Sequence, residues 1–211
     1  MIFNSNYENR HDIINFYSKP EDKYLEIGIA NGNTFNKIQL KNKIGVDPCP
    51  NYKDNNIIIK TSDLFFLDLN KDTNFDIIFI DGMHQSEYVL NDINNSINFL
   101  SDNGIIIMDD ILPVLFNEQI KIPNKHKYEN GILKTLESWT GDIWKVMYHI
   151  LIFYSKNIKF KYFSNKNYRG VAVINIIEKF QIANDDILVI NEYDYYNNFK
   201  DYQNLLNKYN S

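Results

Sequence analysis

The feature that most constrains the fold is a recurring unit, in which a short apolar run is followed by a longer amphipathic stretch. The apolar runs occupy residues 23–28, 43–47, 57–60, 75–81 and 104–109. Each run is brief and apolar on both faces, as the buried strands of parallel sheets are. We therefore predict a strand at each run and a mostly parallel sheet with helices on both of its faces.

The stretches between the strands predict the helices. Val89, Ile93 and Ile97 repeat every four residues, which predicts a helix over 85–100 with its Asn- and Asp-rich positions 91, 92, 94 and 95 toward solvent. Further helices are expected over 8–18, from 33 to about 41, over 142–156 and in the tail at 192–211. Two late strands, 158–164 and 170–176, flank a short turn and predict an antiparallel hairpin at one sheet edge. The predicted fold class is a doubly wound α/β sheet with this C-terminal antiparallel edge hairpin.

Length and charge narrow the class of protein. The 211 residues fit one domain, with an N-terminal helical cap at 1–22, a long connection at 111–140 and a C-terminal tail at 177–211. The net charge is −5, whereas a nucleic-acid surface needs clustered Lys and Arg. The chain has 32 Ile, 32 Asn and 20 Lys but only Arg10 and Arg169, a bias that follows AT-rich codons. Nucleic acid is therefore not an expected partner.

Cysteine content and apolar segments bear on the compartment. Cys49 is the single cysteine, which excludes a disulfide framework and a thiolate metal site. Residues 1–6 lack the basic-then-apolar pattern of a signal peptide. The longest apolar stretch, 144–154, is interrupted by Lys145 and His149 and is too short to span a bilayer. We therefore expect a cytoplasmic protein without a membrane span.

Candidate ligand-binding residues follow the strands, because ligands of such sheets sit outside the carboxyl ends of the strands. After the first strand, Gly28 and Gly32 allow a sharp turn and the close approach of a ligand. Their spacing is neither that of a dinucleotide-binding loop nor that of a P-loop. Asp47 ends the second strand and can accept both hydroxyls of a ribose. Ser62 and Asp63 follow the third strand, where Asp63 can bind an adenine amino group.

These motifs resemble those of known methyltransferases. Glu26-x-Gly28-x-x-x-Gly32-x-Thr34 followed by Gly45-Val46-Asp47 is similar to the S-adenosylmethionine site of class I methyltransferases. Residues 79–110 resemble the small bacterial O-methyltransferases grouped with macrocin and cephamycin enzymes. Residues 139–145 resemble a W-x-G-D-V-W-K stretch in uncharacterised members often encoded beside surface-polysaccharide genes. The resemblance covers about residues 10–176.

The resemblance implies a Rossmann-like fold, an S-adenosylmethionine cofactor and methyl transfer to oxygen. By it, Glu26, Gly28 and Gly32 shape the methionine end of the cofactor pocket, Asp47 binds the ribose, and Ser62 with Asp63 faces the adenine. Asp81, at the next strand end, is also expected at the cofactor. The gene-neighbourhood habit of similar sequences implies a small-molecule acceptor, most simply a sugar in glycan or nucleotide-sugar metabolism. Polysaccharide biosynthesis is therefore the expected context.

Methyl transfer to a hydroxyl also requires loss of a proton, and two devices are open. Asp81 ends the fourth strand, while Asp109 and Asp110 end the fifth, so these three carboxylates could hold Mg²⁺. Alternatively, His84, three residues after Asp81, could act as the general base, or serve only to cap the following helix. Asp81 and His84 are the candidate catalytic residues.

Other functions and roles remain open alternatives. The rivals are a metal-independent methyltransferase that relies on His84, an NAD-type oxidoreductase, which the glycine spacing disfavours, and a non-catalytic nucleotide-binding module. The 111–140 connection is expected to cover the substrate. Lys145 could pair with an anionic substrate, although a solvated lysine is the simpler expectation. Tyr193, Tyr195 and Tyr196 of the tail could form a contact between copies in a homo-oligomer.

Overall fold

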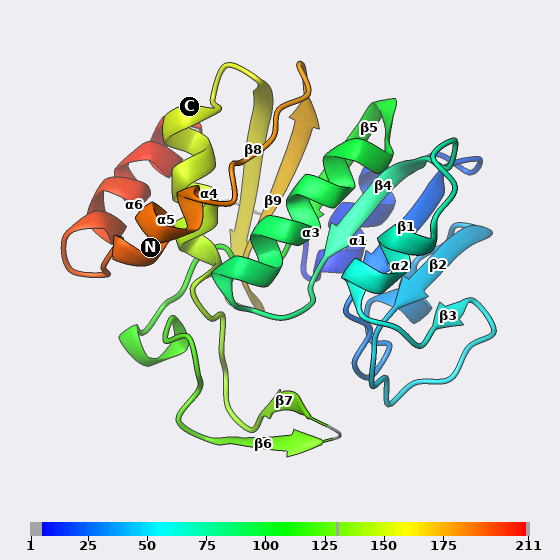
Figure 1. Cartoon of the computed structure of the whole chain (residues 1–211), viewed down its shortest axis with the longest axis horizontal. Helices are drawn as coiled ribbons and strands as arrows, with labels where there is room; N and C mark the ends of the chain where they lie inside the picture. Colours follow the sequence, from blue (N-terminus) through cyan, green and yellow to red (C-terminus); the bar gives the residue numbers. More distant parts are fainter. Residues whose placement is uncertain (1–5, 130, 210–211) are drawn as a thin grey trace.

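The computed structural model describes residues 6–129 and 131–209, and its centre is a seven-stranded sheet (Figure 1). The strand order is β3-β2-β1-β4-β5-β9-β8. β9 pairs antiparallel with both β5 and β8, and the other pairs are parallel. The strands are β1 (Lys23–Ile27), β2 (Asn42–Val46), β3 (Ile57–Ile58), β4 (Phe75–Ile80), β5 (Leu100–Met108), β8 (Ile158–Asn165) and β9 (Tyr168–Ile176). The predicted doubly wound sheet with an antiparallel edge hairpin is confirmed.

The two faces of the sheet are covered unequally. On one face lie α2 (Ser62–Asp68), α3 (Ser86–Phe99), α4 (Ile143–Phe153), α5 (Asp186–Glu192) and α6 (Asn198–Lys208). The opposite face carries α1 (Arg10–Tyr17), which buries Ile13 and Ile14, and one 3₁₀ turn, η1 (Phe35–Lys37). Side chains alternate along each strand, so every second residue of β1, β4 and β5 points toward α1. This alternation decides which strand-end residues α1 meets.

The prediction of a helix over 33–41 is wrong, because that segment forms only η1. Phe35, Ile38 and Leu40 are buried against the α1 face of the sheet, and β2 begins already at Asn42. The crossover is too short for an α-helix that also buries these three side chains. The glycine loop after β1 therefore has no α-helix N-terminus behind it.

The tail also differs from the expected surface helix. α5 and α6 pack on α4, where Tyr202 is fully buried and its ring lies 5.9 Å from that of Trp144. Tyr193 and Tyr195 pack partly against this same core, and only Tyr196 is largely exposed. Part of the tail, including Tyr202, thus belongs to the core of its own chain. Residues 210–211 of the predicted tail helix lie outside the described residues, as do residues 1–5 of the segment examined for a signal peptide.

The prediction that the polar positions of the 85–100 helix face solvent is wrong for two of them. Asp92 and Asn94 are 2% and 5% exposed. The Asn94 side chain donates to the carbonyl of Ile182 at 2.9 Å and accepts from the backbone N–H of Ile182 at 3.0 Å. The segment leading into α5 covers this side of α3, which the period of the apolar residues does not reveal.

The 111–140 connection forms a 3₁₀ turn, η2 (Phe116–Glu118), and a small hairpin of β6 (His126–Glu129) and β7 (Ile132–Thr135). This hairpin stands away from the main sheet in Figure 1. It contacts the loop after β2, where the Lys134 ammonium donates to the carbonyl of Cys49 at 2.9 Å. Within the described part of the chain, no helix is long and apolar enough to cross a membrane.

Candidate active site at the carboxyl ends of the strands

Three carboxylates project toward α1 from three neighbouring strands. Glu26, Asp81 and Asp109 come from β1, from the end of β4 and from the end of β5, and the register places these strand ends side by side. Arg10 of α1 is their counter-ion. Its Nη1 lies 3.1 Å from Asp81 and is also paired with Asp109, while its Nε donates to the hydroxyl of Thr34 at 2.9 Å. One arginine thus joins α1, the glycine loop and two strand ends.

Burial keeps part of this acid group protonated. Glu26 is 1% exposed and accepts a hydrogen bond from the Tyr24 hydroxyl at 2.6 Å. Burial raises the pKa of Glu26 to about 8, against the opposing effect of the Tyr24 bond. Asp109 is also fully buried, which raises its pKa although Arg10 opposes the change. Its Oδ1 has no hydrogen-bond partner among the described residues.

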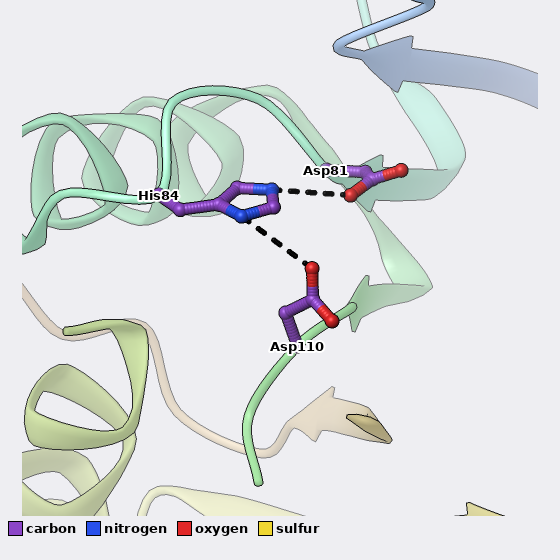
Figure 2. A group of neighbouring side chains, drawn as sticks. All are labelled: Asp81, His84 and Asp110. Atoms are coloured by element: carbon purple, nitrogen blue, oxygen red, sulfur yellow. Dashed lines mark ion pairs between the residues drawn. The ribbon is translucent and has the colours of Figure 1, made fainter. Parts of the chain in front are cut away.

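A second cluster lies at the same edge of the sheet, where His84 stands between Asp81 and Asp110 (Figure 2). Nε2 of the ring is 3.4 Å from Asp81, and Nδ1 is 3.4 Å from Asp110. One ligand atom from each residue lies within 4.8 Å of the others, so the three can hold a metal ion. Asp110 has a φ of +58°, a strained backbone conformation for a non-glycine residue.

The structure groups the predicted metal ligands differently from the expectation. Asp81 and Asp110 are brought together, but Asp109 is replaced by His84. Because side chains alternate along a strand, Asp109 follows Ile105 and Ile107 onto the α1 face and pairs with Arg10 there. The side chains that lie together offer two carboxylates and one imidazole. Imidazole suits Zn²⁺ and Fe²⁺, and carboxylate suits Mn²⁺ and Mg²⁺, so a transition ion fits this set better than Mg²⁺ alone.

The charge state of His84 follows from its neighbours. Burial lowers the pKa of the ring, but the hydrogen bond with Asp81, the charges of Asp110 and Asp81 and the Trp139 carbonyl together raise it to about 9. The protonated ring is therefore favoured at neutral pH. Both a general base and a metal ligand require the neutral ring, so His84 would lose this proton in either role.

The segment at 139–142 holds His84 in place. The Trp139 carbonyl lies 2.9 Å from Nδ1, and the Trp139 ring stacks on the imidazole with centroids 5.1 Å apart. Gly141 has a φ of +58°, and a Cβ there would lie 1.5 Å from the carbonyl oxygen of His84. Asp142 accepts from the backbone N–H of Ser86 at 2.7 Å, which caps the start of α3. Residues 139–142 thus hold the end of the 111–140 connection against the loop that carries His84.

The glycine loop is organised by Asp47. Its Oδ2 accepts the backbone N–H groups of Ile29 and Ala30, both at 2.9 Å, and its Oδ1 accepts that of Cys49 at 2.7 Å. Gly28 has a φ of +90°, and a Cβ there would lie 2.0 Å from the backbone oxygen of Asp81. Asp47 therefore fixes the shape of the loop. Its Oδ2 already accepts two N–H groups, and its Oδ1 keeps a lone pair for a further donor.

The remaining predicted site residues lie at the start of α2. Ser62 is partly buried and donates to Asp92 of α3, while Asp63 is exposed. Burial raises the pKa of Asp92 to about 7, against the effect of the Ser62 bond. The Oδ1 of Asp92 has no partner among the described residues. Gly32, also predicted, has a φ of +71° and packs against the Tyr52 ring.

A cavity of about 570 Å³ opens beside both carboxylate clusters. Its walls come from the start of α1, the glycine loop, the end of β5, the end of the connection and the β8–β9 turn. The lining residues are Asn9, Arg10, His11, Asn33, Thr34, Asp109, Asp110, Ser138, Trp139, Asn167, Tyr168 and Arg169. The size lies within the range of small-molecule sites.

Glu118 fixes the connection over this cavity. Its carboxylate accepts from the backbone N–H groups of Val114 and Leu115, from the Ser138 hydroxyl, and from the guanidinium of Arg169 at 2.8 to 3.1 Å. Both ends of the connection and β9 therefore meet at one side chain. Lys145, by contrast, donates to the carbonyl of Asn191 and lies among residues outside this cavity.

Sequence reasoning missed Arg10, Glu118 and Arg169. A usable signal existed, because the only two arginines of the chain both line the cavity. The alternation along β1 and β5 also places Glu26 and Asp109 on the face that α1 covers. No sequence pattern pairs Glu118 with Arg169, since the bond depends on how the connection folds.

Comparison with known proteins gives consistent results. Residues 25–111 match a family described as a methyltransferase domain. The uncharacterised protein R132 of Acanthamoeba polyphaga mimivirus is 27% identical over 133 residues, which cover 52% of this chain and 60% of the viral protein. The match thus spans less than two thirds of that relative.

Two solved structures share the fold at low sequence identity. The O-methyltransferase TomG from Streptomyces achromogenes, in complex with S-adenosylmethionine, is 11% identical with a TM-score of 0.51, covering 80% of this chain and 78% of TomG. The sugar N-methyltransferase KedS8 from a Streptoalloteichus species is 8% identical with a TM-score of 0.50, covering 80% of this chain and 85% of KedS8.

Proposed function

We propose that this chain transfers the methyl group of S-adenosylmethionine to a hydroxyl oxygen of a sugar. Two findings support the proposal: residues 25–111 match a methyltransferase domain family, and the fold is shared with the O-methyltransferase TomG. The observation that carries the proposal is that one cavity is lined both by the glycine loop, through Asn33 and Thr34, and by Asp110 of the Asp81–His84–Asp110 cluster. The cofactor supplies an electrophilic methyl group on a sulfonium.

The cofactor fits the residues that are present. The buried Oδ1 of Asp109, a residue of the cavity wall, lacks a partner among the described residues. An ammonium group such as that of S-adenosylmethionine can donate to an oxygen of this kind. Asp47, held by three backbone N–H groups, is oriented to accept from a ribose. Ser62 and Asp63, at the start of α2, are proposed to face the adenine.

The residues of the chain then position the acceptor. An in-line displacement gains most from holding the acceptor oxygen against the methyl group. We assign this task to the cavity walls and to the 111–140 connection, which Glu118 holds over the cavity. The asparagines of the lining offer amide groups that suit the hydroxyls of a sugar. The sugar activity of KedS8, which shares the fold, is in keeping with this assignment.

Metal assistance is part of the proposal. Asp81, His84 and Asp110 would hold a divalent ion, which would act as a Lewis acid toward the acceptor hydroxyl. The geometric observation behind it is the approach of three ligand atoms to within 4.8 Å. The alternative is a metal-independent enzyme in which His84 itself handles the proton. That alternative retains one favourable observation, namely that the ring already lies between two carboxylates.

The test is a turnover assay. The protein is incubated with S-adenosylmethionine and a panel of sugars and nucleotide sugars, and S-adenosylhomocysteine is quantified by chromatography, with and without EDTA. We expect S-adenosylhomocysteine to form only when a sugar acceptor is present. EDTA should stop its formation, and added Mn²⁺ or Mg²⁺ should restore it. Turnover that survives EDTA would favour the metal-independent alternative. Cofactor binding without turnover on any acceptor would indicate a binding module.

A further inference from the structure

Both arginines of the chain line the cavity, and each presents its cation there while its partner carboxylate is hidden. The side chain of Arg10 is 32% exposed and that of its partner Asp109 only 1%. Arg169 is 29% exposed and its partner Glu118 only 4%. Two independent ion pairs therefore have the same orientation toward one cavity. In each of these two pairs, the guanidinium group is the partner that a ligand in the cavity can reach.

Arg169 is the more available of the two for an incoming group. Arg10 already pairs with Asp81 and Asp109 in the carboxylate cluster. Arg169 donates to Glu118 through Nε and Nη2, and within residues 6–129 and 131–209 no hydrogen bond or ion pair of its Nη1 is found. A guanidinium in this state can still donate to a further oxygen.

Arg169 is also held rigidly. Glu118 receives three donors besides the arginine, so its position is fixed by the connection itself. The carbonyl of Arg169 accepts from the backbone N–H of Leu112 at 2.6 Å. A guanidinium fixed by its partners loses little conformational freedom on binding an anion, and its planar fork matches carboxylate and phosphate oxygens.

We propose that the acceptor carries an anionic oxygen group, a carboxylate or a phosphate, and that Arg169 binds it in this cavity. The inference rests on the proposed function and specifies its substrate class. The acceptor is thus a sugar acid or a sugar phosphate rather than a neutral sugar. Its hydroxyl would face the Asp81–His84–Asp110 cluster while its anionic group meets Arg169.

Three probes of similar size test this proposal and separate the two sources of the charge. Glucuronate supplies a carboxylate, glucose 1-phosphate supplies a phosphate, and methyl glucoside is neutral. Each is titrated by calorimetry into the protein with S-adenosylhomocysteine, and also into the protein alone. We expect one of the anionic probes to bind about ten- to a hundredfold more tightly than methyl glucoside, as a charged hydrogen bond provides.

Two variants assign the effect to the residue. In Arg169→Gln the preference for the anionic probe is expected to fall by about tenfold or more. In Lys159→Gln, which removes the same charge from an exposed site on β8, the preference should persist. Arg169→Lys, which keeps the charge without the planar fork, should retain part of it. Thermal unfolding of each variant establishes that it is folded.

Equal binding of the three probes by the wild-type protein would overturn the inference without any variant. An unchanged preference in Arg169→Gln would overturn the assignment to this residue. If S-adenosylhomocysteine does not bind, the proposed function fails, whereas the probes still report on the cavity in the protein alone. Failure of the two proposals is therefore distinguishable.

Discussion

At the scale of single residues, Arg10 has the largest effect on the charge balance of the site. Its guanidinium contacts Asp81, Asp109 and Thr34, which belong to β4, β5 and the glycine loop. Without it, the Asp109 carboxylate would be buried with no cation beside it. His84 has the corresponding place in the second cluster, between Asp81 and Asp110. Asp81 belongs to both clusters and couples them.

Replacement of Arg10 by Gln should destabilise the fold. Removing one partner of a buried ion pair costs about 3–5 kcal/mol, and we expect about 1–3 kcal/mol here because a third of the Arg10 side chain is exposed. Urea unfolding measures the change in the free energy of unfolding. Lys19→Gln, an exposed charge next to α1, is the control. Equal effects of the two changes would contradict the role given to Arg10.

Metal binding should discriminate between the two candidate ligand sets. Calorimetric titration with Mn²⁺ is expected to show that His84→Gln weakens binding by at least about tenfold. Asp109→Asn should change the affinity much less, because Asp109 faces Arg10 rather than the cluster. The opposite order of effects would restore the all-carboxylate site expected from the sequence.

At the scale of elements, the site depends on short segments that lock larger ones together. The Trp139–Asp142 segment joins the connection, the His84 loop and the start of α3. Glu118 joins both ends of the connection to β9. The contact between α2 and α3 includes the buried Asp92. In each case one polar side chain or one glycine determines how two elements meet.

Gly141→Ala should be far more harmful than Gly131→Ala. Both glycines have a positive φ, of +58° and +80°, so both substitutions strain the backbone by about 1–2 kcal/mol. The added Cβ at position 141 would overlap the His84 carbonyl, whereas at 131 it meets nothing within 4 Å. We expect a loss above about 3 kcal/mol for Gly141→Ala in urea unfolding. Similar losses for both would show that Gly141 does not contact the His84 loop.

Asp92 should make stability depend on pH. Its pKa is about 7 in the folded protein and near 3.8 when exposed, so the folded state alone keeps the proton between these values. Stability contributed by this group is present below pH 3.8 and is lost as pH rises toward 7, by at most about 1.4 kcal/mol per pH unit. Asp92→Asn should therefore lose less stability than the wild type between pH 5 and 8 in urea unfolding. The exposed Asp102→Asn should behave like the wild type; parallel pH profiles for all three proteins would refute this prediction.

At the scale of the whole molecule, the strand pattern is sufficient to predict the sheet. It does not predict as well which helices and loops cover the two faces of the sheet. Buried strands have a local signature, so β1, β2, β4, β5 and the edge hairpin were predictable. The 33–41 segment was mistaken for a helix, because its apolar residues serve the core rather than a helical face. Asp110 and His84 were found as candidates from strand-end positions. Asp109 lies apart from His84 and Asp110 because side chains alternate along β5 and because Asp109 pairs with Arg10. The sequence does not reveal this pair, since the two residues are 99 positions apart.

Calorimetric titration with S-adenosylmethionine and S-adenosylhomocysteine, with NADH as the negative control, tests the central claim most directly. We predict micromolar binding of S-adenosylmethionine and S-adenosylhomocysteine and no binding of NADH. Asp47→Ala should lose this binding, because it removes the acceptor of three loop N–H groups. Silence with both ligands, or binding of NADH instead, would contradict the assignment of this site to S-adenosylmethionine.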